Sequence, residues 1–158
     1  MFIDSRTVPL DAVSEMGIGN KPIDDGNYLF SDEEKEAFVK LEPQSAAYFK
    51  RWYGSDEFIN NKVRWCLWLG DCPPDKLRKM PYSLQRIENV RIFRQMSKSE
   101  GTRKIADTPT RFHVENMPES GHYLLVPSTS SEHRKYIPIG FMNSSDISSN
   151  ANLLVPNA

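Results

Sequence analysis

The sequence predicts an α+β fold in which N-terminal helices and a long central helix pack on a small mixed or antiparallel sheet. Helical patterns dominate residues 31–105, short strand-like runs follow, and the two kinds of segment do not alternate. The chain has 158 residues, 39% hydrophobic and 26% charged, which suits one globular core. We therefore expect one domain over residues 19–158, preceded by an extended arm over residues 1–18.

The N-terminal part predicts a short strand and three short helices. Turn residues recur through residues 1–30, so only residues 28–30 are expected to form a strand. Ser31 then has the character of an N-cap, and Glu34 stands three residues on, as in a capping box. We expect a second helix from Pro43 to a stop at Gly54, and a third over SDEFINN.

The central part predicts a buried strand and the longest helix. The run NKVRWCLWL is rich in aromatic and aliphatic residues, as in a strand buried on both faces, and a short helical piece, KLRKM, follows it. Residues 81–105 begin with a proline and then place apolar residues, from Leu84 to Met96, at threefold spacing. On a helix of 3.6 residues per turn, Arg91, Arg94 and Lys98 project within about 60° of one another. A helix end or kink is expected at Gly101 and Thr102.

The C-terminal part predicts strands at FHVE, HYLLVP, YIPIGF and ANLLVP, separated by Pro, Ser, Asn and Gly. The last of these ends abruptly, so we expect the chain to be a fragment of a longer polypeptide.

Charge is unevenly distributed although the formal net charge is −1. Residues 1–75 carry 8 basic and 14 acidic side chains, whereas residues 76–135 carry 12 basic and 6 acidic ones. A basic segment of this kind is typical of contact with a polyanion, while packing of the two halves together would equally neutralise it.

Several kinds of chemistry leave no mark in the sequence. It lacks the glycine-rich loops of nucleotide sites, the N/D-P-P-[YF] tetrapeptide of amino-methyltransferases and a G-x-S-x-G elbow. Two cysteines, Cys66 and Cys72, are too few for a four-ligand zinc site, and we expect free thiols. No apolar run reaches the roughly 20 residues of a membrane span. We expect no catalytic, cofactor or metal site, and a cytoplasmic location.

The stretch SSEHRKYIPIGF, residues 130–141, gathers hydrogen-bond donors before a strand-like run. Its hydroxyl, imidazole, guanidinium and ammonium groups can all bond phosphate oxygens, and Arg134 can do so with two parallel bonds. Together with the basic cluster of RIFRQMSK and with Arg103 and Lys104, it predicts contact with a nucleic-acid backbone.

Five blocks in order carry a family resemblance: NKPIDDGNYLFSDEEKE, FINNKVRWCLWL, ENVRIFRQMSKSEGTRKIADTPTRF, YLLVPSTSSEHRKYIPIGF and NANLLVPNA. Over about residues 19–158 the chain resembles the target recognition domain of MmeI-like restriction-modification enzymes. Two departures occur, because His133 stands where a basic residue is usual and Asp24-Asp25-Gly26-Asn27 replaces the usual DGG turn.

The resemblance implies a DNA-binding domain without catalysis of its own. It implies a parent polypeptide with a fused endonuclease, a helical connector and an adenine-specific DNA methyltransferase domain that uses S-adenosylmethionine, and some base-reading residues beyond residue 158. The implied partners are double-stranded DNA and the neighbouring methyltransferase domain. The residues expected to face DNA, from the basic cluster and the resemblance together, are Arg91, Arg94, Lys98, Ser99, Thr102, Arg103, Lys104, Ser130, Ser131, Arg134, Lys135 and Tyr136.

Two other hypotheses stay open at this point. The domain could be an interaction module that docks on the methyltransferase domain through exposed aromatic residues of RWCLWL and YFKRWY. It could also be a small hydrolase that uses His113, His122 and His133, although histidines at such spacing are more often ordinary surface residues.

Overall fold

The computed structural model describes residues 14–157 and has helices and strands in two separate four-stranded sheets. The strands are β1 (Gly17–Ile18), β2 (Leu29–Phe30), β3 (Phe49–Tyr53), β4 (Trp65–Leu67), β5 (His122–Pro127), β6 (Gly140–Asn143), β7 (Ile147–Ser148) and β8 (Asn152–Pro156). The helices are α1 (Asp32–Leu41), α2 (Ser55–Ile59), α3 (Pro74–Leu77), α4 (Pro81–Gln95) and α5 (Glu100–Lys104), with a 3₁₀ helix at Pro43–Tyr48. The predicted α+β class is confirmed, with two sheets instead of one.

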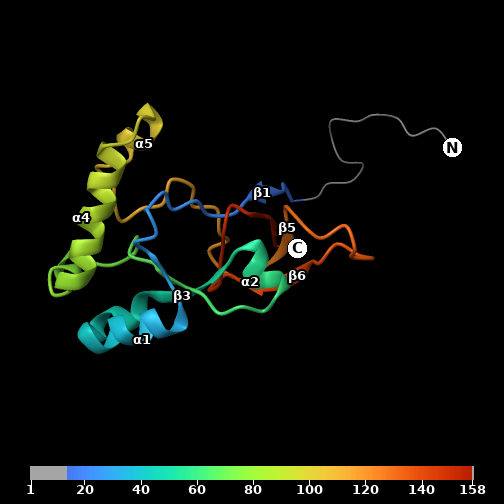
Figure 1. The fold of residues 1–158 in the computed structure, drawn as a ribbon, viewed down its shortest axis with the longest axis horizontal. Helices are drawn as coiled ribbons and strands as arrows, with labels where there is room; N and C mark the ends of the chain where they lie inside the picture. The colour runs from blue at the N-terminus through green and yellow to red at the C-terminus, as the bar shows by residue number, and fades with distance from the viewer. Residues whose placement is uncertain (1–13, 158) are drawn as a thin grey trace.

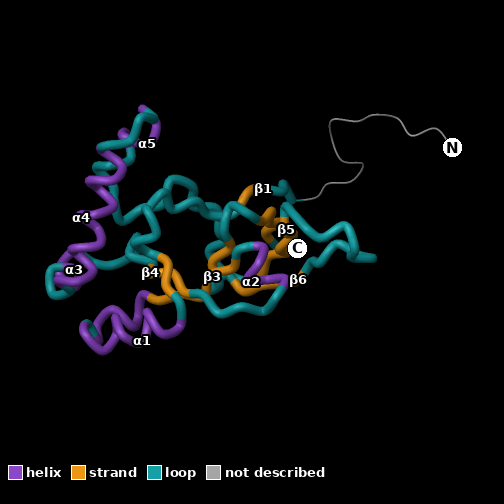
Figure 2. Tube along the Cα trace, in the orientation of Figure 1, coloured by secondary structure: helices purple, strands orange, loops and turns teal. Residues whose placement is uncertain are grey.

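The two sheets interleave the ends of the chain. One is antiparallel, in the order β1-β8-β5-β6, and joins the first described strand to the last. The other has the order β2-β4-β3-β7 and is mixed, because β7 runs parallel to β3. Figure 1 shows the antiparallel sheet at the end of the molecule opposite α4, and Figure 2 shows α1, α3, α4 and α5 gathered at that other end. Residues 17–18 of the predicted arm form β1 and therefore belong to the antiparallel sheet.

The first turn of α1 forms as its sequence predicts. The Ser31 hydroxyl accepts a hydrogen bond from the Glu34 amide at 3.2 Å, and the Glu34 carboxylate accepts from the Ser31 amide at 2.8 Å. This capping box satisfies two amide groups that have no partner inside the helix. The buried face of α1 is Phe38, whose ring packs edge-on against Phe30 at a centroid distance of 5.3 Å.

The larger core lies around the mixed sheet. Phe30 and Phe49 from two strands meet edge-on at 5.0 Å, and Trp52, Cys66 and Leu67 are buried beside them. The helix α4 closes this core with Ile87 and Val90. A smaller core lies under the antiparallel sheet and contains Tyr123, Leu125 and Leu154.

Two predicted helices are wrong in part. The segment from Pro43 to Gly54 is helical only to Tyr48 and then becomes β3, which pairs with β4 through Phe49 to Arg51 and with β7 through Trp52 and Tyr53. The helix predicted over residues 81–105 is interrupted between α4 and α5, so the break precedes Gly101. The expected strand FHVE contributes one isolated bridge, from Val114 to Lys21. Residues 1–13 of the predicted arm lie outside the described residues.

Candidate nucleic-acid interface

The structure separates the residues predicted to face DNA into two groups. One group lies on α4, α5 and the turn between them, and the other lies in the connection between β5 and β6, residues 128–139. Figure 1 shows α5 and this connection, drawn in orange, at opposite ends of the long axis of the molecule. A nucleic acid that contacts both groups must therefore extend along the molecule.

Arg94 does not lie at the surface. Its side chain is fully buried, and its guanidinium donates five hydrogen bonds to backbone carbonyls over 2.8 to 3.1 Å. The acceptors are the carbonyls of Pro22, Ile23, Ile105, Thr108 and Arg111. Burial lowers the pKa of this guanidinium, but an arginine remains charged in proteins. All five donors are used within the fold, so the prediction that Arg94 projects with Arg91 and Lys98 as a DNA contact is wrong.

Arg91 remains accessible but has an acidic neighbour. Its Nε and Nη2 bond the Glu88 carboxylate at 2.8 and 2.5 Å, one turn earlier on α4. This hydrogen bond raises the pKa of Arg91 and lowers the pKa of Glu88. Exposed pairs of this kind are weak. A phosphate could therefore replace the carboxylate, with Glu88 opposing it.

The turn between α4 and α5 is held by its own side chains. Ser99 is the N-cap of α5, and its hydroxyl accepts from the Thr102 amide at 3.4 Å. Arg103 donates from Nη1 to the carbonyls of Ser97 and Lys98 at 2.8 and 2.9 Å. Lys104 pairs with Glu100 at 2.9 Å. Lys98 and Arg103 are exposed, whereas Thr102 is half-buried.

The predicted loop residues of the β5–β6 connection are all exposed: Ser130, Ser131, Arg134, Lys135 and Tyr136. Two local bonds order the turn: the Arg134 amide donates to the Ser131 carbonyl at 3.1 Å, and the His133 amide donates to the Ser131 hydroxyl at 3.2 Å. The Lys135 ammonium lies 5.4 Å from the Tyr136 ring centroid. The side chains of Arg134 and Lys135 remain directed to the surface, as a phosphate contact requires.

The helix α2 forms part of the surroundings of this loop, which the sequence analysis did not anticipate. Ser130, Ser131 and Arg134 share a shallow pocket of about 370 Å³ with Asp56 and Asn60. Gly140 at the start of β6 allows this approach, because a Cβ there would meet the Phe58 ring of α2 at 2.9 Å. Hydrogen bonds from Lys62 and Asn60 lower the pKa of Asp56. A phosphate at this pocket would meet the Arg134 guanidinium and the Asn60 amide, and it would also face the Asp56 carboxylate, which is paired with Lys62.

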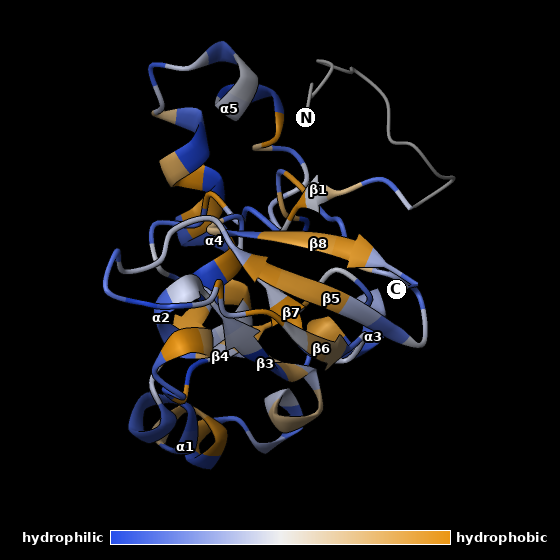
Figure 3. Ribbon diagram, turned by 90° about the vertical axis from the view of Figure 1, so that its right-hand side faces the viewer, coloured by the Kyte–Doolittle hydropathy of each residue, from blue (hydrophilic) through white to orange (hydrophobic). Residues whose placement is uncertain are grey.

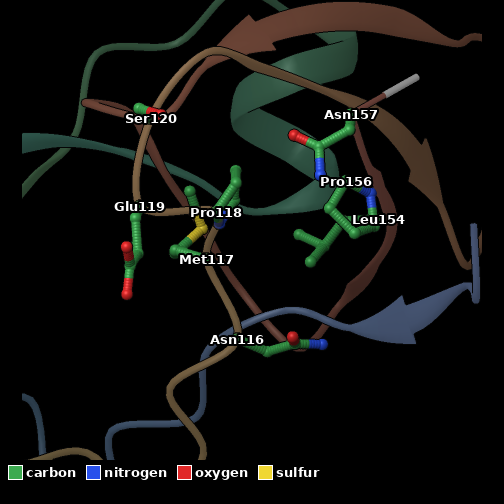
Figure 4. Close-up of a pocket in the computed structure, with 8 residues that line it drawn as sticks. All are labelled: Asn116, Met117, Pro118, Glu119, Ser120, Leu154, Pro156 and Asn157. Carbon is green, nitrogen blue, oxygen red and sulfur yellow. The ribbon is translucent and has the colours of Figure 1, made fainter.

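A second pocket, of about 430 Å³, contains none of the predicted residues. Figure 4 shows it between the segment from Asn116 to Ser120 and the end of β8, with Leu154, Pro156 and Asn157 on the opposite wall. Glu119 is its one charged lining residue, so this pocket does not suit an anion.

The side chains that could ligate a metal are dispersed over the described residues. Within residues 14–157, no three His, Cys, Asp or Glu side chains are grouped so that they could hold a metal ion. All three histidines are exposed. Cys66 and Cys72 are free thiols as predicted, and burial raises the pKa of Cys66. No described helix has both the length and the apolar character of a membrane span.

The aromatic residues proposed for docking are mostly inside the protein. Trp52 and Trp68 are buried, and Trp68 meets Phe112 edge-on at 4.9 Å. Aromatic side chains exposed on the described surface include Tyr82, Phe93, Tyr136 and Phe141. The docking hypothesis therefore cannot rest on RWCLWL and YFKRWY.

The fold and this surface define an α+β binding domain with two separate polar and cationic segments. A family model described as MmeI, target recognition domain, matches residues 1–158, and the chain belongs to this family. It is 36% identical over 150 residues to DNA methyltransferase A of Bacillus subtilis (strain 168), a match that covers 95% of this chain and 17% of that protein.

A solved structure gives the same result for the fold. It is the type IIL restriction-modification enzyme MmeI in complex with DNA, which is 49% identical and superimposes with a TM-score of 0.92. The match covers 97% of this chain and 20% of MmeI. The chain thus spans about one fifth of the length of these relatives.

Proposed function

We propose that the chain binds duplex DNA as the target recognition domain of a restriction-modification DNA methyltransferase. The observation that supports this most strongly is the similarity to MmeI, at 49% identity and a TM-score of 0.92, in a structure that contains DNA. That similarity covers 97% of the chain.

The contact chemistry we propose is mainly to phosphate. Arg134 and Lys135 would bond the backbone at one end of the interface, and Lys98 and Arg103 would do so at the other. Ser130, Ser131, Ser99 and Tyr136 would add neutral hydrogen bonds, which position a protein on DNA without reading bases. Thr102, Arg91 and Lys104 belong to the same surface but are half-buried or paired with acids.

We propose further that the chain is one domain of a longer enzyme. The parent protein would be a site-specific adenine DNA methyltransferase with a fused endonuclease, which uses S-adenosylmethionine in its methyltransferase domain and works in the cytoplasm. This chain would bind DNA without modifying it, and its second partner would be that methyltransferase domain. Sequencing the open reading frame upstream and downstream of this segment tests directly whether methyltransferase and endonuclease domains adjoin it.

A titration of fluorescent duplex DNA by the chain over a range of salt concentrations tests DNA binding. Binding should weaken steeply with salt, because each phosphate contact releases counterions and adds about 0.9 to the slope of log K against log salt. The double variant Arg134→Ala/Lys135→Ala should lower this slope by about 2.

The matched control is Arg78→Ala/Lys79→Ala, which removes two exposed cations outside both candidate segments. It should leave the slope unchanged to within about 0.5. The proposal fails if the chain does not bind duplex DNA at low salt and the full-length enzyme is unaffected by the Arg134 and Lys135 substitutions.

A further inference from the structure

The antiparallel sheet has two apolar faces. Tyr123, Leu125 and Leu154 point from one face into the smaller core. The strand residues that alternate with them form the outer face: Ile18, Leu124, Val126, Phe141, Leu153 and Val155, and Ile139 follows at its edge, one residue before β6. Successive side chains of a strand point to opposite faces, so these residues share one surface. We call this surface the outer sheet face.

The strand register brings the side chains of the outer sheet face together. Leu124 stands opposite Phe141 on one side and Val155 on the other. Leu153 stands opposite Val126 and Ile18 in the same way. Directly opposed residues on one face have Cβ atoms about 5 Å apart, so the six paired side chains form a continuous patch across four strands.

The described residues leave this face uncovered. Ile18, Ile139 and Phe141 are 47%, 57% and 67% exposed, and the four side chains between them are half-buried, although they belong to the two central strands. Figure 3 looks onto the sheet, with β5 and β8 coloured as hydrophobic and no described helix in front of them. A sheet that is apolar on both faces is normally buried on both faces, so the outer sheet face lacks the cover that its composition calls for.

The chemistry of the face excludes DNA as its occupant. No lysine or arginine lies on it, and the polar residues at one end are the opposed pair Asn143 and His122. The cations that would attract a polyanion lie beyond it, in the β5–β6 connection and near α5. An apolar protein surface is therefore the matching partner.

The area of the outer sheet face indicates what kind of protein surface can cover it. Four strands about 4.8 Å apart, with about four residues of 3.3 Å each, cover on the order of 250 Å². A stable interface between separate proteins buries about 800 Å² on each partner, so this face is too small to hold a second copy. A partner in the same polypeptide needs far less area, because the linkage supplies an effective concentration near millimolar. The relatives carry about four fifths of their length outside the matched region.

We propose that the outer sheet face docks on an apolar surface elsewhere in the same long polypeptide. This inference rests on the proposed function, which places the chain within a methyltransferase. It assigns the domain a second surface, distinct from the cationic segments, that fixes the position of the DNA-binding residues relative to the rest of the enzyme.

Cysteine labelling tests the inference. In a Cys72→Ser background, Phe141→Cys places a thiol on the face, and Glu36→Cys places one on the exposed surface of α1 as the control. Maleimide labelling rates are measured in the isolated chain and in the full-length polypeptide, with Ile139→Cys as a second position on the face should Phe141→Cys misfold. Phe141→Cys should label at least about ten-fold more slowly in the full-length polypeptide, which corresponds to about 1.4 kcal/mol of protection.

Glu36→Cys should label at the same rate in both forms. Equal rates for Phe141→Cys in both forms, or equal slowing at both positions, overturn the inference. Slow labelling of the isolated chain also overturns the inference. If the labelling rate falls as the protein concentration rises, a second copy of the chain covers the face. If labelling is slow at every concentration, the chain itself covers the face. Methylation and DNA binding of the same samples are measured in parallel. Their loss defeats the proposed function, whereas rapid Phe141→Cys labelling in an active enzyme defeats this inference alone.

Discussion

Replacing Arg94 should destabilise the whole domain, although Arg94 lies in a segment predicted to bind DNA. Its guanidinium joins the 22–23 segment to the 105–111 segment through five carbonyls. One of these belongs to Ile23, which has a φ of 49°. That conformation is unfavourable for a β-branched residue, so the Arg94 bond helps to hold it.

The magnitude follows from the carbonyls left behind. An unsatisfied buried acceptor costs about 1–3 kcal/mol, and water can reach some of the five in an Arg94→Met variant. We expect a loss of about 4 kcal/mol in the free energy of unfolding, which at this chain length lowers Tm by about 12 °C. Arg94→Lys keeps the charge but has three donors, so it should lose about half as much.

Thermal unfolding followed by circular dichroism measures both variants. The control is Arg91→Met, one turn earlier on α4, where the exposed partner Glu88 can return to solvent and Tm should change by less than about 2 °C. Equal Tm values for Arg94→Met and Arg91→Met would refute this account of Arg94.

Three further predictions concern stability. Glu42 is buried, and its carboxylate accepts hydrogen bonds from the amides of Tyr82 and Ser83 at the start of α4. Glu42→Ala should therefore lower the free energy of unfolding by about 2–3 kcal/mol, measured by urea unfolding. The control Glu36→Ala should leave this free energy unchanged. At Gly19 a Cβ would lie 2.7 Å from the Ser148 carbonyl oxygen and closer still to that of Ser149, so Gly19→Ala should lower Tm, whereas Gly101→Ala in α5 should raise it slightly. Burial raises the pKa of Asp146, so its stabilising contribution is complete below its unfolded pKa of about 3.9 and is lost as pH rises through the folded value. Asp146→Asn should therefore remove part of the decline in unfolding free energy as pH rises above about 4, measured by urea unfolding across pH, and an unchanged pH dependence would contradict this.

The elements that could be predicted from the sequence are those set by neighbouring residues. The capping box of Ser31 and Glu34 lies within four consecutive residues, and apolar runs in the sequence predict the strands β5 and β8. The start of α4 shows the limit, because Glu42 reaches its amides from forty residues earlier. No local pattern contains that contact.

The strand β3 was mistaken for a helix for a related reason. Phe49–Tyr53 follows a short 3₁₀ helix, and its local sequence predicts that this helix continues. Pairing with β4 and β7 instead determines its extended conformation. Strand pairing joins distant segments and overrides local preference.

The candidate site was predicted less well than the fold, and Arg94 shows why. A helical wheel groups residues by direction but does not say which direction is inward. The buried stripe of α4 is Ser83, Ile87, Val90 and Arg94, whereas Phe93 and Met96 from the predicted apolar stripe are exposed. Carbonyls from two distant segments replaced the hydration of the guanidinium, and only the folded chain brings them together.

Ion pairing ranks the remaining cations as DNA contacts. Arg91 and Lys104 each have a glutamate partner on the same helix surface, which a phosphate must displace and would then face. Arg103 already donates to two carbonyls. Among the described residues, Lys98, Arg103, Arg134 and Lys135 have no acidic side chain of the protein within 4 Å as an ion-pair partner. These four cations should therefore account for most of the salt dependence of DNA binding, since a cation already neutralised by a carboxylate releases fewer counterions when a phosphate replaces that carboxylate.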